Sequence, residues 1–185
     1  MVKNIVFKEL EINDIHENLL HKFNRFQKVK MYYRKENGGW VIKDTNYAVN
    51  WTDWKIKEII NVFIYALNNG GIIAGAYEND RLIGFAILLN DEEYGKQYMK
   101  LEYMFVTLEY RHKGVGTHLF KLCTDKACEK GVEKILILAA DAEETQRFLF
   151  SLGFVDVKEQ NEEYLEKYPN HRQLEYALNN KVKSG

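Results

Sequence analysis

Proline is almost absent from this chain, because Pro169 is the only one in 185 residues. The chain also lacks Gly/Ser-rich linkers, internal repeats and low-complexity tracts. Segments of these kinds often mark the boundary between two domains, so nothing in the sequence supports a two-domain organisation. A chain of this length can bury a sizeable core by itself. We therefore expect a single domain over residues 1–185, with a flexible tail at 179–185.

An excess of one charge sign is also missing, since 26 Lys and Arg residues stand against 27 Asp and Glu residues, for a formal net charge of −1. Proteins that bind the phosphates of nucleic acids need a clustered basic excess, so we expect no nucleic-acid partner. No apolar run approaches the roughly 20 residues that cross a bilayer, and residues 1–10 lack the apolar core of a signal peptide. These absences predict a cytoplasmic protein with no membrane partner.

Cysteine is scarce as well, with only Cys123 and Cys128, which lie five positions apart on a predicted helix. This spacing suits neither a disulfide nor a Cys-x-x-Cys metal site, and neither residue is placed to form an acyl-enzyme. His16 and His21 are also five positions apart, which does not put both on one helix face. We therefore expect no metal, and we interpret both cysteines as small packing residues.

The most informative stretch covers residues 100–130. An apolar strand ends at Val106 and is followed by a short polar loop. The loop leads into an amphipathic helix through Arg111-His112-Lys113-Gly114-Val115-Gly116. The first N–H groups of a helix lack partners and carry partial positive charge, and glycine removes side chains where a ligand must come close. With the charges of Arg111 and Lys113 beside it, this helix start predicts a ligand that carries phosphate groups.

Apolar periodicity divides the chain into strands and helices. Strands are expected over residues 5–10, 72–77, 82–89, 100–106, 135–139, 154–157 and 172–178. Helices are expected over residues 15–26, 54–67, 114–130 and 142–152. Residues 29–53 are rich in aromatic side chains and contain Gly38 and Gly39, and we predict a loop or a short hairpin there. Residues 91–96 read as a polar turn.

Arg111, Gly114 and Gly116 form an Arg-x-x-Gly-x-Gly motif after a strand that ends in Val. This motif resembles the acyl-CoA-binding motif of the GCN5-related N-acetyltransferases, the GNAT superfamily. Residues 148–154 resemble a second segment of that family, Phe-Tyr-x-x-x-Gly-Phe, and the order of elements resembles its fold. The resemblance implies an α/β (α+β) fold with a mixed, mostly antiparallel central sheet of about seven strands, flanked by about four helices.

The same resemblance implies acetyl-CoA as the cosubstrate. Its diphosphate would bind at the helix start, and its pantetheine arm would pair with the backbone at the end of the preceding strand, where an amide faces the thioester carbonyl. The residues assigned to cofactor binding in this way are Met104, Phe105, Val106, Arg111, His112, Lys113, Gly114, Val115, Gly116 and Thr117.

The activity that the resemblance implies is transfer of an acetyl group from acetyl-CoA to a primary amine of a small molecule, by direct attack in a ternary complex. Two alternatives stay open. In the first, the acceptor is an amine of a protein or peptide. In the second, the chain is a noncatalytic acyl-CoA-binding sensor module. Residues 164–178 weakly resemble streptothricin acetyltransferases. The sequence also leaves a homodimer open.

Glu102 lies four residues before Val106 on the predicted strand, at a position where some GNAT members carry a general base. Strand alternation puts Met104 and Val106 on the same face as Glu102, and such apolar neighbours would suit a carboxylate that accepts the proton of the amine. The alternative is a glutamate at a solvated strand end, without a catalytic role.

The leaving thiolate needs a proton, and many family members supply it from a tyrosine in the second motif. Here that position is Leu149, which has no proton to give, and Ala142 replaces an asparagine that is common one and a half turns earlier. Another hydroxyl group or water must then protonate the thiolate. The candidate hydroxyls are those of Tyr103, Tyr110 and Tyr164.

Aromatic residues before the second predicted helix would form a pocket for a cationic or flat acceptor. The candidate substrate residues are Tyr33, Trp51 and Trp54, together with Glu93 in the polar turn, which would attract a positive amine. The alternative is structural, because aromatic residues more often pack a loop onto the core and a charge run is usually a solvated turn.

Overall fold

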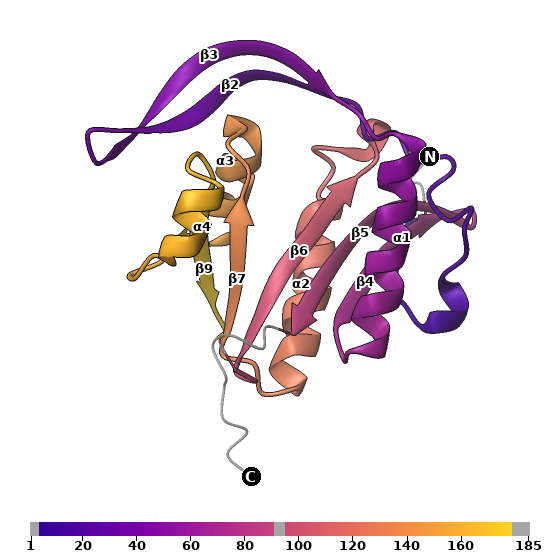
Figure 1. The fold of residues 1–185 in the computed structure, drawn as a ribbon. Coiled ribbons are helices and arrows are strands. Elements are labelled where there is room, and N and C mark those ends of the chain that lie inside the picture. The colour runs from indigo at the N-terminus through magenta and orange to yellow at the C-terminus, as the bar shows by residue number, and fades with distance from the viewer. Residues whose placement is uncertain (1–3, 91–94, 179–185) are drawn as a thin grey trace.

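A computed structural model describes residues 4–90 and 95–178 of the chain (Figure 1). Within these residues, seven strands form one sheet in the order β1-β4-β5-β6-β7-β9-β8. Their bounds are β1 (Val6–Glu9), β4 (Ile72–Glu78), β5 (Arg81–Asn90), β6 (Tyr98–Val106), β7 (Lys134–Ala139), β8 (Val155–Asp156) and β9 (Arg172–Ala177). The helices are α1 (Asp53–Asn68), α2 (Val115–Glu129), α3 (Glu143–Leu152) and α4 (Glu162–Lys167). A separate hairpin consists of β2 (Gln27–Glu36) and β3 (Gly39–Val49).

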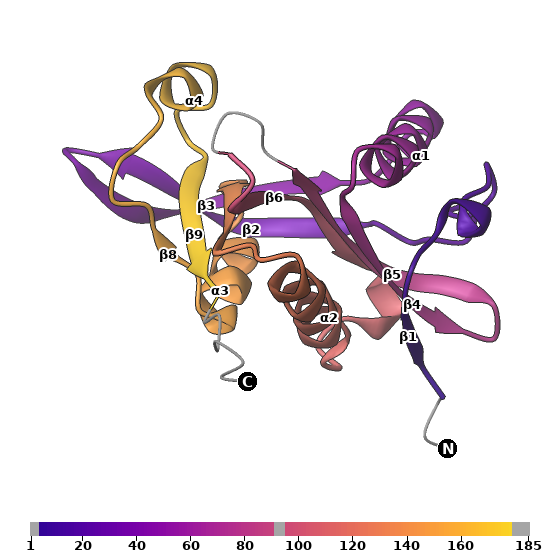
Figure 2. The same ribbon diagram turned by 90° about the horizontal axis from the view of Figure 1, so that it is seen from below.

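Helices cover both faces of the sheet. α1 and α4 lie on one face, and α2 and α3 lie on the other (Figures 1 and 2). Each face has its own apolar core, and alternate residues of β5 serve the two cores. Phe85 packs with Phe63 of α1, whereas Ala86 packs in the cluster that contains Leu119 and Cys123 of α2. A strand buried on both faces has a continuous apolar sequence, which explains the run of apolar residues in β5.

The sheet is split between β6 and β7. These two strands are parallel and pair over three positions, residues 98–100 with residues 134–136. Each strand keeps its other neighbour, since β6 pairs with β5 up to Val106 and β7 pairs with β9 up to Ala139. Beyond the three shared positions β6 and β7 diverge (Figure 1). Among the described residues, the facing edges of their last residues therefore have no strand partner.

The β2–β3 hairpin arches over the open end of this split (Figure 1). It is tied to the loop between β7 and α3, because the N–H of Tyr33 donates to the carbonyl of Asp141 at 2.8 Å. Asn37 and Gly38 at its tip both have positive φ, 49° and 80°, as a tight hairpin turn requires. The hairpin thus connects the α1 side of the split with the α3 side.

The predicted fold class is confirmed, and most elements lie within two residues of their expected bounds. Of the predicted polar turn at 91–96, residues 91–94 lie outside the described residues, as does the predicted tail at 179–185. In the parts of the chain that the structure describes, no helix has the length and apolar character needed to span a membrane.

The helix predicted over residues 15–26 is wrong. A short 3-10 helix, η1 (Ile12–Asp14), is followed by turns that bond three residues back, as the N–H of Leu19 does to His16 at 3.0 Å. The N–H of Asn24 donates to the hydroxyl of Thr107 at 2.9 Å, which ties the end of the segment to the residue that follows β6. The apolar residues still pack into the α1-side core. Turns can therefore satisfy the same apolar spacing as a helix.

Two other elements were underestimated or missed. Of the predicted segment 29–53, residues 29–49 belong to a long hairpin with strands of 10 and 11 residues, not to a loop or a short hairpin. Most of its residues are exposed or half-buried, so its strands lack the apolar alternation that predicts a strand. The six-residue helix α4 was not predicted, although Asn161 caps it by accepting from the N–H of Tyr164 at 3.2 Å.

Candidate active site

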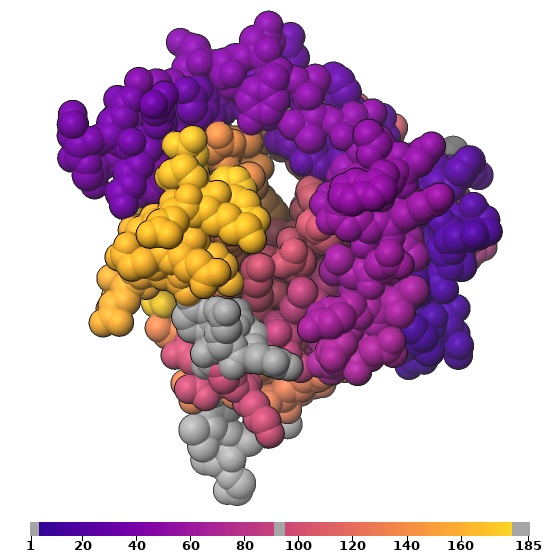
Figure 3. Space-filling model, viewed as in Figure 1, coloured from indigo at the N-terminus to yellow at the C-terminus, as the bar shows by residue number. Residues whose placement is uncertain are grey.

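A cavity of about 870 Å³ occupies the split between β6 and β7. Its walls are the last residues of the two strands, the start of α2 and the first turns of α3. Figure 3 shows an opening beneath the hairpin, on the side where the strands diverge. Of the ten residues predicted to bind the cofactor, nine line this cavity and Lys113 does not. The edge of β6 is therefore accessible to a ligand that extends along it.

The start of α2 forms one wall of the cavity. Its N-cap residue, Gly114, is exposed and has a left-handed conformation with φ 78°, which costs a glycine little. The first turn of α2 contains no acidic residue. Because the first N–H groups of a helix have no partner within the helix, this end of α2 retains its positive potential for an anion.

Gly116 has a packing role as well as a place in the cavity wall. It is buried, and a Cβ atom at this position would lie 2.8 Å from Cζ of Phe148. Phe148 belongs to the second segment that resembles the family. The two motifs are therefore in direct contact, and the absence of a side chain at Gly116 lets α2 and α3 approach closely.

The side chain of Arg111 is committed to backbone carbonyls. Its Nε donates to Val106 at 2.9 Å, and its terminal nitrogens donate to Phe26 at 2.8 Å and Arg25 at 3.1 Å. Burial lowers the pKa of this guanidinium, while Glu144 and Glu109 oppose the shift. Arg111 thus fastens the segment before the hairpin to the end of β6, a role that the motif alone did not indicate.

The other charged side chains of the motif also have protein partners. The ammonium group of Lys113 donates to the carbonyl of Glu109 at 2.6 Å. His112 lies 3.2 Å from Oε1 of Glu144, and Oε2 of the same carboxylate accepts from the Gln27 amide at 3.2 Å. The backbone amides at the start of α2, more than these side chains, remain for a ligand.

Glu102 lines the cavity, as predicted for a residue near the reaction, and its side chain is 25% exposed. It sits at an irregularity of β6, where Leu101 pairs with Leu88 and Tyr103 pairs with Ile87, so that Glu102 is the extra residue. Its surroundings are less apolar than expected, because its carboxylate lies 2.9 Å from the ammonium group of Lys100.

The position where many relatives carry a tyrosine, Leu149, is buried and lines the same cavity. Two of the tyrosines considered in its place also line the cavity, but their hydroxyl groups are engaged elsewhere. That of Tyr103 donates to Glu58 at 3.1 Å and accepts from Lys55 at 3.0 Å, and burial raises its pKa. That of Tyr110 donates to Glu78.

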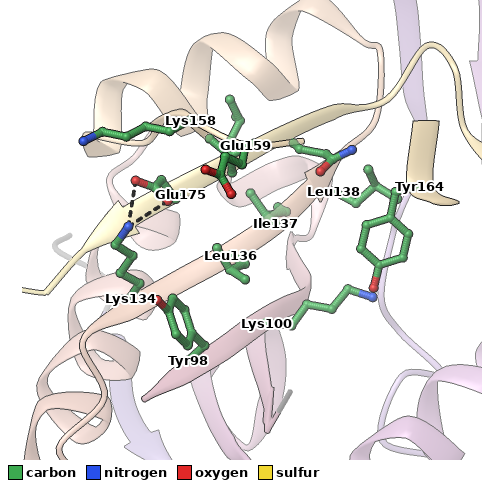
Figure 4. Close-up of a pocket in the computed structure, with 13 residues that line it drawn as sticks. Tyr98, Lys100, Lys134, Leu136, Ile137, Leu138, Lys158, Glu159, Tyr164 and Glu175 are labelled. Carbon is green, nitrogen blue, oxygen red and sulfur yellow. Dashed lines mark hydrogen bonds and ion pairs between the residues drawn. The ribbon is translucent and has the colours of Figure 1, made fainter. Parts of the chain in front are cut away.

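A second cavity of about 330 Å³ lies between β6, β7, β9 and the segment that leads into α4. Figure 4 shows Tyr98 and Lys100 of β6, Tyr164 of α4, and the ion pair between Lys134 and Glu175, which is 3.0 Å long. The ammonium group of Lys100 lies 6.0 Å from the centre of the Tyr164 ring. Since Lys100 lines this cavity and its partner Glu102 lines the larger one, the two cavities are neighbours.

The predicted substrate residues are not gathered at either cavity. Trp51 packs against Phe105 with ring centres 5.0 Å apart, and Trp54 is 73% exposed at the start of α1. Tyr33 is half-buried on the hairpin, where the guanidinium of Arg172 lies 5.8 Å from its ring. Glu93 lies outside the described residues.

Arg25 lines the larger cavity and was missed by the sequence interpretation. Its guanidinium carbon lies 4.7 Å from the centre of the Phe105 ring, and its Nε is buried without a hydrogen-bond partner. Nothing in the local sequence marks this residue, because the predicted helix over 15–26 gave it no relation to β6.

Comparison with known proteins identifies the family. The Acetyltransferase (GNAT) family matches residues 26–154, which is more than half of the chain. The chain belongs to the GNAT family of acetyltransferases. The resemblance and the enzyme class predicted from the motif, an acetyl-CoA-dependent acetyltransferase, are thereby confirmed. A Xenopus tropicalis relative named "Probable N-acetyltransferase 14" is 31% identical over 85 residues, which cover 45% of this chain and 40% of that protein.

Solved structures show the same fold. One is a Bacillus anthracis protein assigned as a streptothricin acetyltransferase, in complex with acetyl coenzyme A, with a TM-score of 0.69 and 20% identity over 95% of this chain and 98% of that one. Nourseothricin acetyltransferase has a TM-score of 0.68 and 14% identity over 94% and 98%. The PaiA N-acetyltransferase from Thermoplasma acidophilum, in complex with coenzyme A, has a TM-score of 0.59 and 13% identity over 94% and 99%. At these identities the likeness establishes the fold of this GNAT protein.

The contact between the two motifs can be tested by a double-mutant cycle. We expect Gly116→Ala to lower the free energy of unfolding by about 1–3 kcal/mol, because the added Cβ forces the Phe148 ring to move. In a Phe148→Leu background the penalty of Gly116→Ala should be smaller by about 1 kcal/mol or more. Urea unfolding measures both values.

Gly39→Ala is the matched control, because the nearest atom to a Cβ there is 3.8 Å away. Gly39→Ala should change the free energy of unfolding only slightly, with or without the Phe148 ring. An equal penalty for Gly116→Ala with and without the Phe148 ring would contradict the assigned contact.

Proposed function

We propose that this GNAT protein transfers the acetyl group of acetyl-CoA to a primary amine of a small molecule, by direct attack within a ternary complex. The observation that carries the proposal is the cavity between β6 and β7, which joins an unpaired strand edge to a helix start that is open to anions. The streptothricin and nourseothricin acetyltransferases of the same fold are named for small-molecule acceptors, which supports this choice over a protein acceptor.

The residues of the cavity fit a coenzyme A thioester. We assign its diphosphate to the first N–H groups of α2, from Gly114 to Thr117, and its pantetheine arm to the edge of β6 at Met104 to Val106. When bound, acetyl-CoA supplies the activated acetyl group. The chain supplies the position of this group, because the strand edge and the helix start both belong to rigid elements of the core.

Glu102 is our candidate for the general base. An alkylamine is mostly protonated at neutral pH, so its proton must leave before or during attack. Glu102 is the one β6 carboxylate in the cavity lining, and it lies at the irregularity of the strand. Lys100, at 2.9 Å, would keep this carboxylate oriented until the amine arrives.

The departing thiolate takes its proton from water in this proposal. Leu149 has no proton to give, and the hydroxyl groups of Tyr103 and Tyr110 donate to Glu58 and Glu78. Tyr164 lines the second cavity instead of this one. Water reaches the site through the opening beneath the hairpin (Figure 3).

The amine would approach from the face of the sheet that carries α1 and α4. The start of α2 lies on the opposite face, so the diphosphate and the acceptor enter the split from different sides (Figure 2). The second cavity lies beside Glu102 on the acceptor side and offers room for the rest of the acceptor. Its lining combines apolar side chains with three lysines and two glutamates.

An amine panel tests the transfer activity. Purified protein is mixed with acetyl-CoA and either small amines, polyamines, aminoglycosides, streptothricin or peptides, and free thiol is followed. We expect thiol release that depends on one class of small amine and is matched by acetylated product. Release with peptides alone would favour the protein acceptor. Stabilisation by acetyl-CoA without thiol release over any amine would indicate a sensor and contradict the proposal.

The assigned diphosphate site predicts the effect of a charge at the start of α2. Gly114→Glu should weaken acetyl-CoA binding by at least about 10-fold, because a carboxylate would occupy the anion site. Gly131→Glu is the matched control, since Gly131 follows the other end of α2 with nearly the same φ, 76° against 78°, and therefore nearly the same strain. Calorimetry should find wild-type affinity for Gly131→Glu, and equal affinity in both variants would refute the placement.

The role of Glu102 predicts a loss of turnover without a loss of donor binding. Glu102→Gln should lower kcat by about 100-fold or more, as removal of a general base usually does, and leave the acetyl-CoA affinity unchanged. Glu129→Gln, an exposed position on α2, controls for the change of net charge. Unchanged turnover in Glu102→Gln would remove this residue from the mechanism.

A further inference from the structure

Arg25 differs from the other charged side chains of the larger cavity. Seven Arg, His and Glu side chains line it, and six of them have a hydrogen-bond or ion-pair partner. The paired residues are Glu102, Arg111, His112, Glu143, Glu144 and Arg147. The guanidinium of Arg25 makes no hydrogen bond or ion pair with any residue that the structure describes, and its buried Nε lacks a partner. Among the described residues, its N–H groups are therefore available to an anion of a ligand.

The contact that Arg25 does make leaves its N–H groups available. Its guanidinium carbon lies 4.7 Å from the centre of the Phe105 ring, an interaction that uses the flat face of the cation. The N–H groups of a guanidinium lie in its plane, and two of them can bind both oxygens of one carboxylate. Arg25 is thus held in position by Phe105, and the in-plane N–H groups of its guanidinium have no acceptor among the described residues.

Burial makes this lack of a partner costly. Loss of water and, to a smaller extent, the positive charge of Arg111 together lower the pKa of Arg25 to about 10, and the negative charge of Glu144 opposes this shift. The group is still charged at neutral pH, so a half-buried cation faces the cavity. A ligand anion that binds it gains a charge-assisted hydrogen bond in a site already shielded from water.

The diphosphate of the donor is not this anion in the proposed complex. Phe105 packs with Trp51 and Phe85 in the core on the α1 side of the sheet. The start of α2, to which we assign the diphosphate, lies on the opposite side (Figure 2). Arg25 therefore lies on the face from which the acceptor enters, beside the strand residues assigned to the thioester.

We propose that Arg25 binds a carboxylate of the acceptor, so that the substrates are small amines that also carry a carboxylate, as amino acids do. This rests on the proposed transfer activity and narrows its substrate class. The amine attacks the acetyl carbon beside Phe105 and its proton passes to Glu102, while the carbon–sulfur bond breaks and the coenzyme A thiolate leaves and takes a proton from water. The carboxylate stays on Arg25 without taking part in bond formation. A polycationic acceptor would meet the uncompensated charge of Arg25 and be disfavoured.

The test compares amino acids with their own carboxamides, which differ only in the charge beside the amine. Thiol release is measured for each pair at equal concentration of the neutral amine, since the carboxamide lowers the amine pKa. We expect the wild-type protein to prefer the acid. Arg25→Gln should lower kcat/KM for the acid by about 10- to 100-fold and leave the carboxamide unchanged. Arg25→Lys keeps the charge and loses the paired N–H groups of the guanidinium. Its kcat/KM for the acid should lie between the values of the wild-type protein and Arg25→Gln.

Arg34→Gln is the matched control, because Arg34 is an exposed arginine of β2 that does not line the cavity. Arg34→Gln should prefer the acid over the carboxamide to the same extent as the wild-type protein. Thermal unfolding and acetyl-CoA affinity of each variant establish that the protein is folded and binds its donor.

Three outcomes would overturn the assignment to an acceptor carboxylate. If both Arg25 variants lowered kcat/KM equally for the acid and the carboxamide, Arg25 would instead stabilise the charge that develops at the thioester. Transfer to carboxamides or polycations with no preference for acids would remove the role of Arg25 and leave the transfer activity in place. No thiol release with any amine would overturn both this inference and the proposed function.

Discussion

The short pairing between β6 and β7 determines the site. Two parallel strands that share three positions and then diverge leave a wedge in the middle of the sheet, lined by backbone that has lost its strand partner. Unpaired backbone groups within a fold are costly unless a ligand or water satisfies them. A chain that keeps such a wedge open therefore favours a ligand with amide groups of its own, and the pantetheine arm of coenzyme A has them. The cavity and the accessible strand edge both follow from this split, and so do the two routes of entry that we propose.

Several contacts hold the wedge open. Gly116 allows α2 to pack directly against Phe148, which fixes the start of α2 against α3. Arg111 binds three carbonyls and thereby fastens the segment before the hairpin to the end of β6. The hairpin then reaches across to Asp141. The motif residues thus hold these elements together, in addition to the role that we propose for them in binding the diphosphate, and the N–H groups of Arg111 donate to the protein for this reason.

The sequence predicted the strands and helices that form the cavity better than it predicted the segments around the acceptor. The Arg-x-x-Gly-x-Gly motif, α1 and the buried strands follow from local patterns, so their prediction needed no knowledge of the rest of the chain. The segment before the hairpin was predicted as a helix because turns with bonds three residues back repeat apolar residues at nearly the same spacing. Its path depends on Thr107 and Arg111, about 80 residues away, and so does the placement of Arg25. Long-range hydrogen bonds of this kind leave no local signal.

A crystal structure of the protein with acetyl-CoA tests the central claim most directly. The account predicts the diphosphate on the N–H groups that open α2 at Gly114 to Thr117, with the pantetheine arm extended along β6 in the split and the thioester beside Phe105. A coenzyme bound elsewhere, or a split closed by pairing of β6 with β7 in the complex, would contradict it.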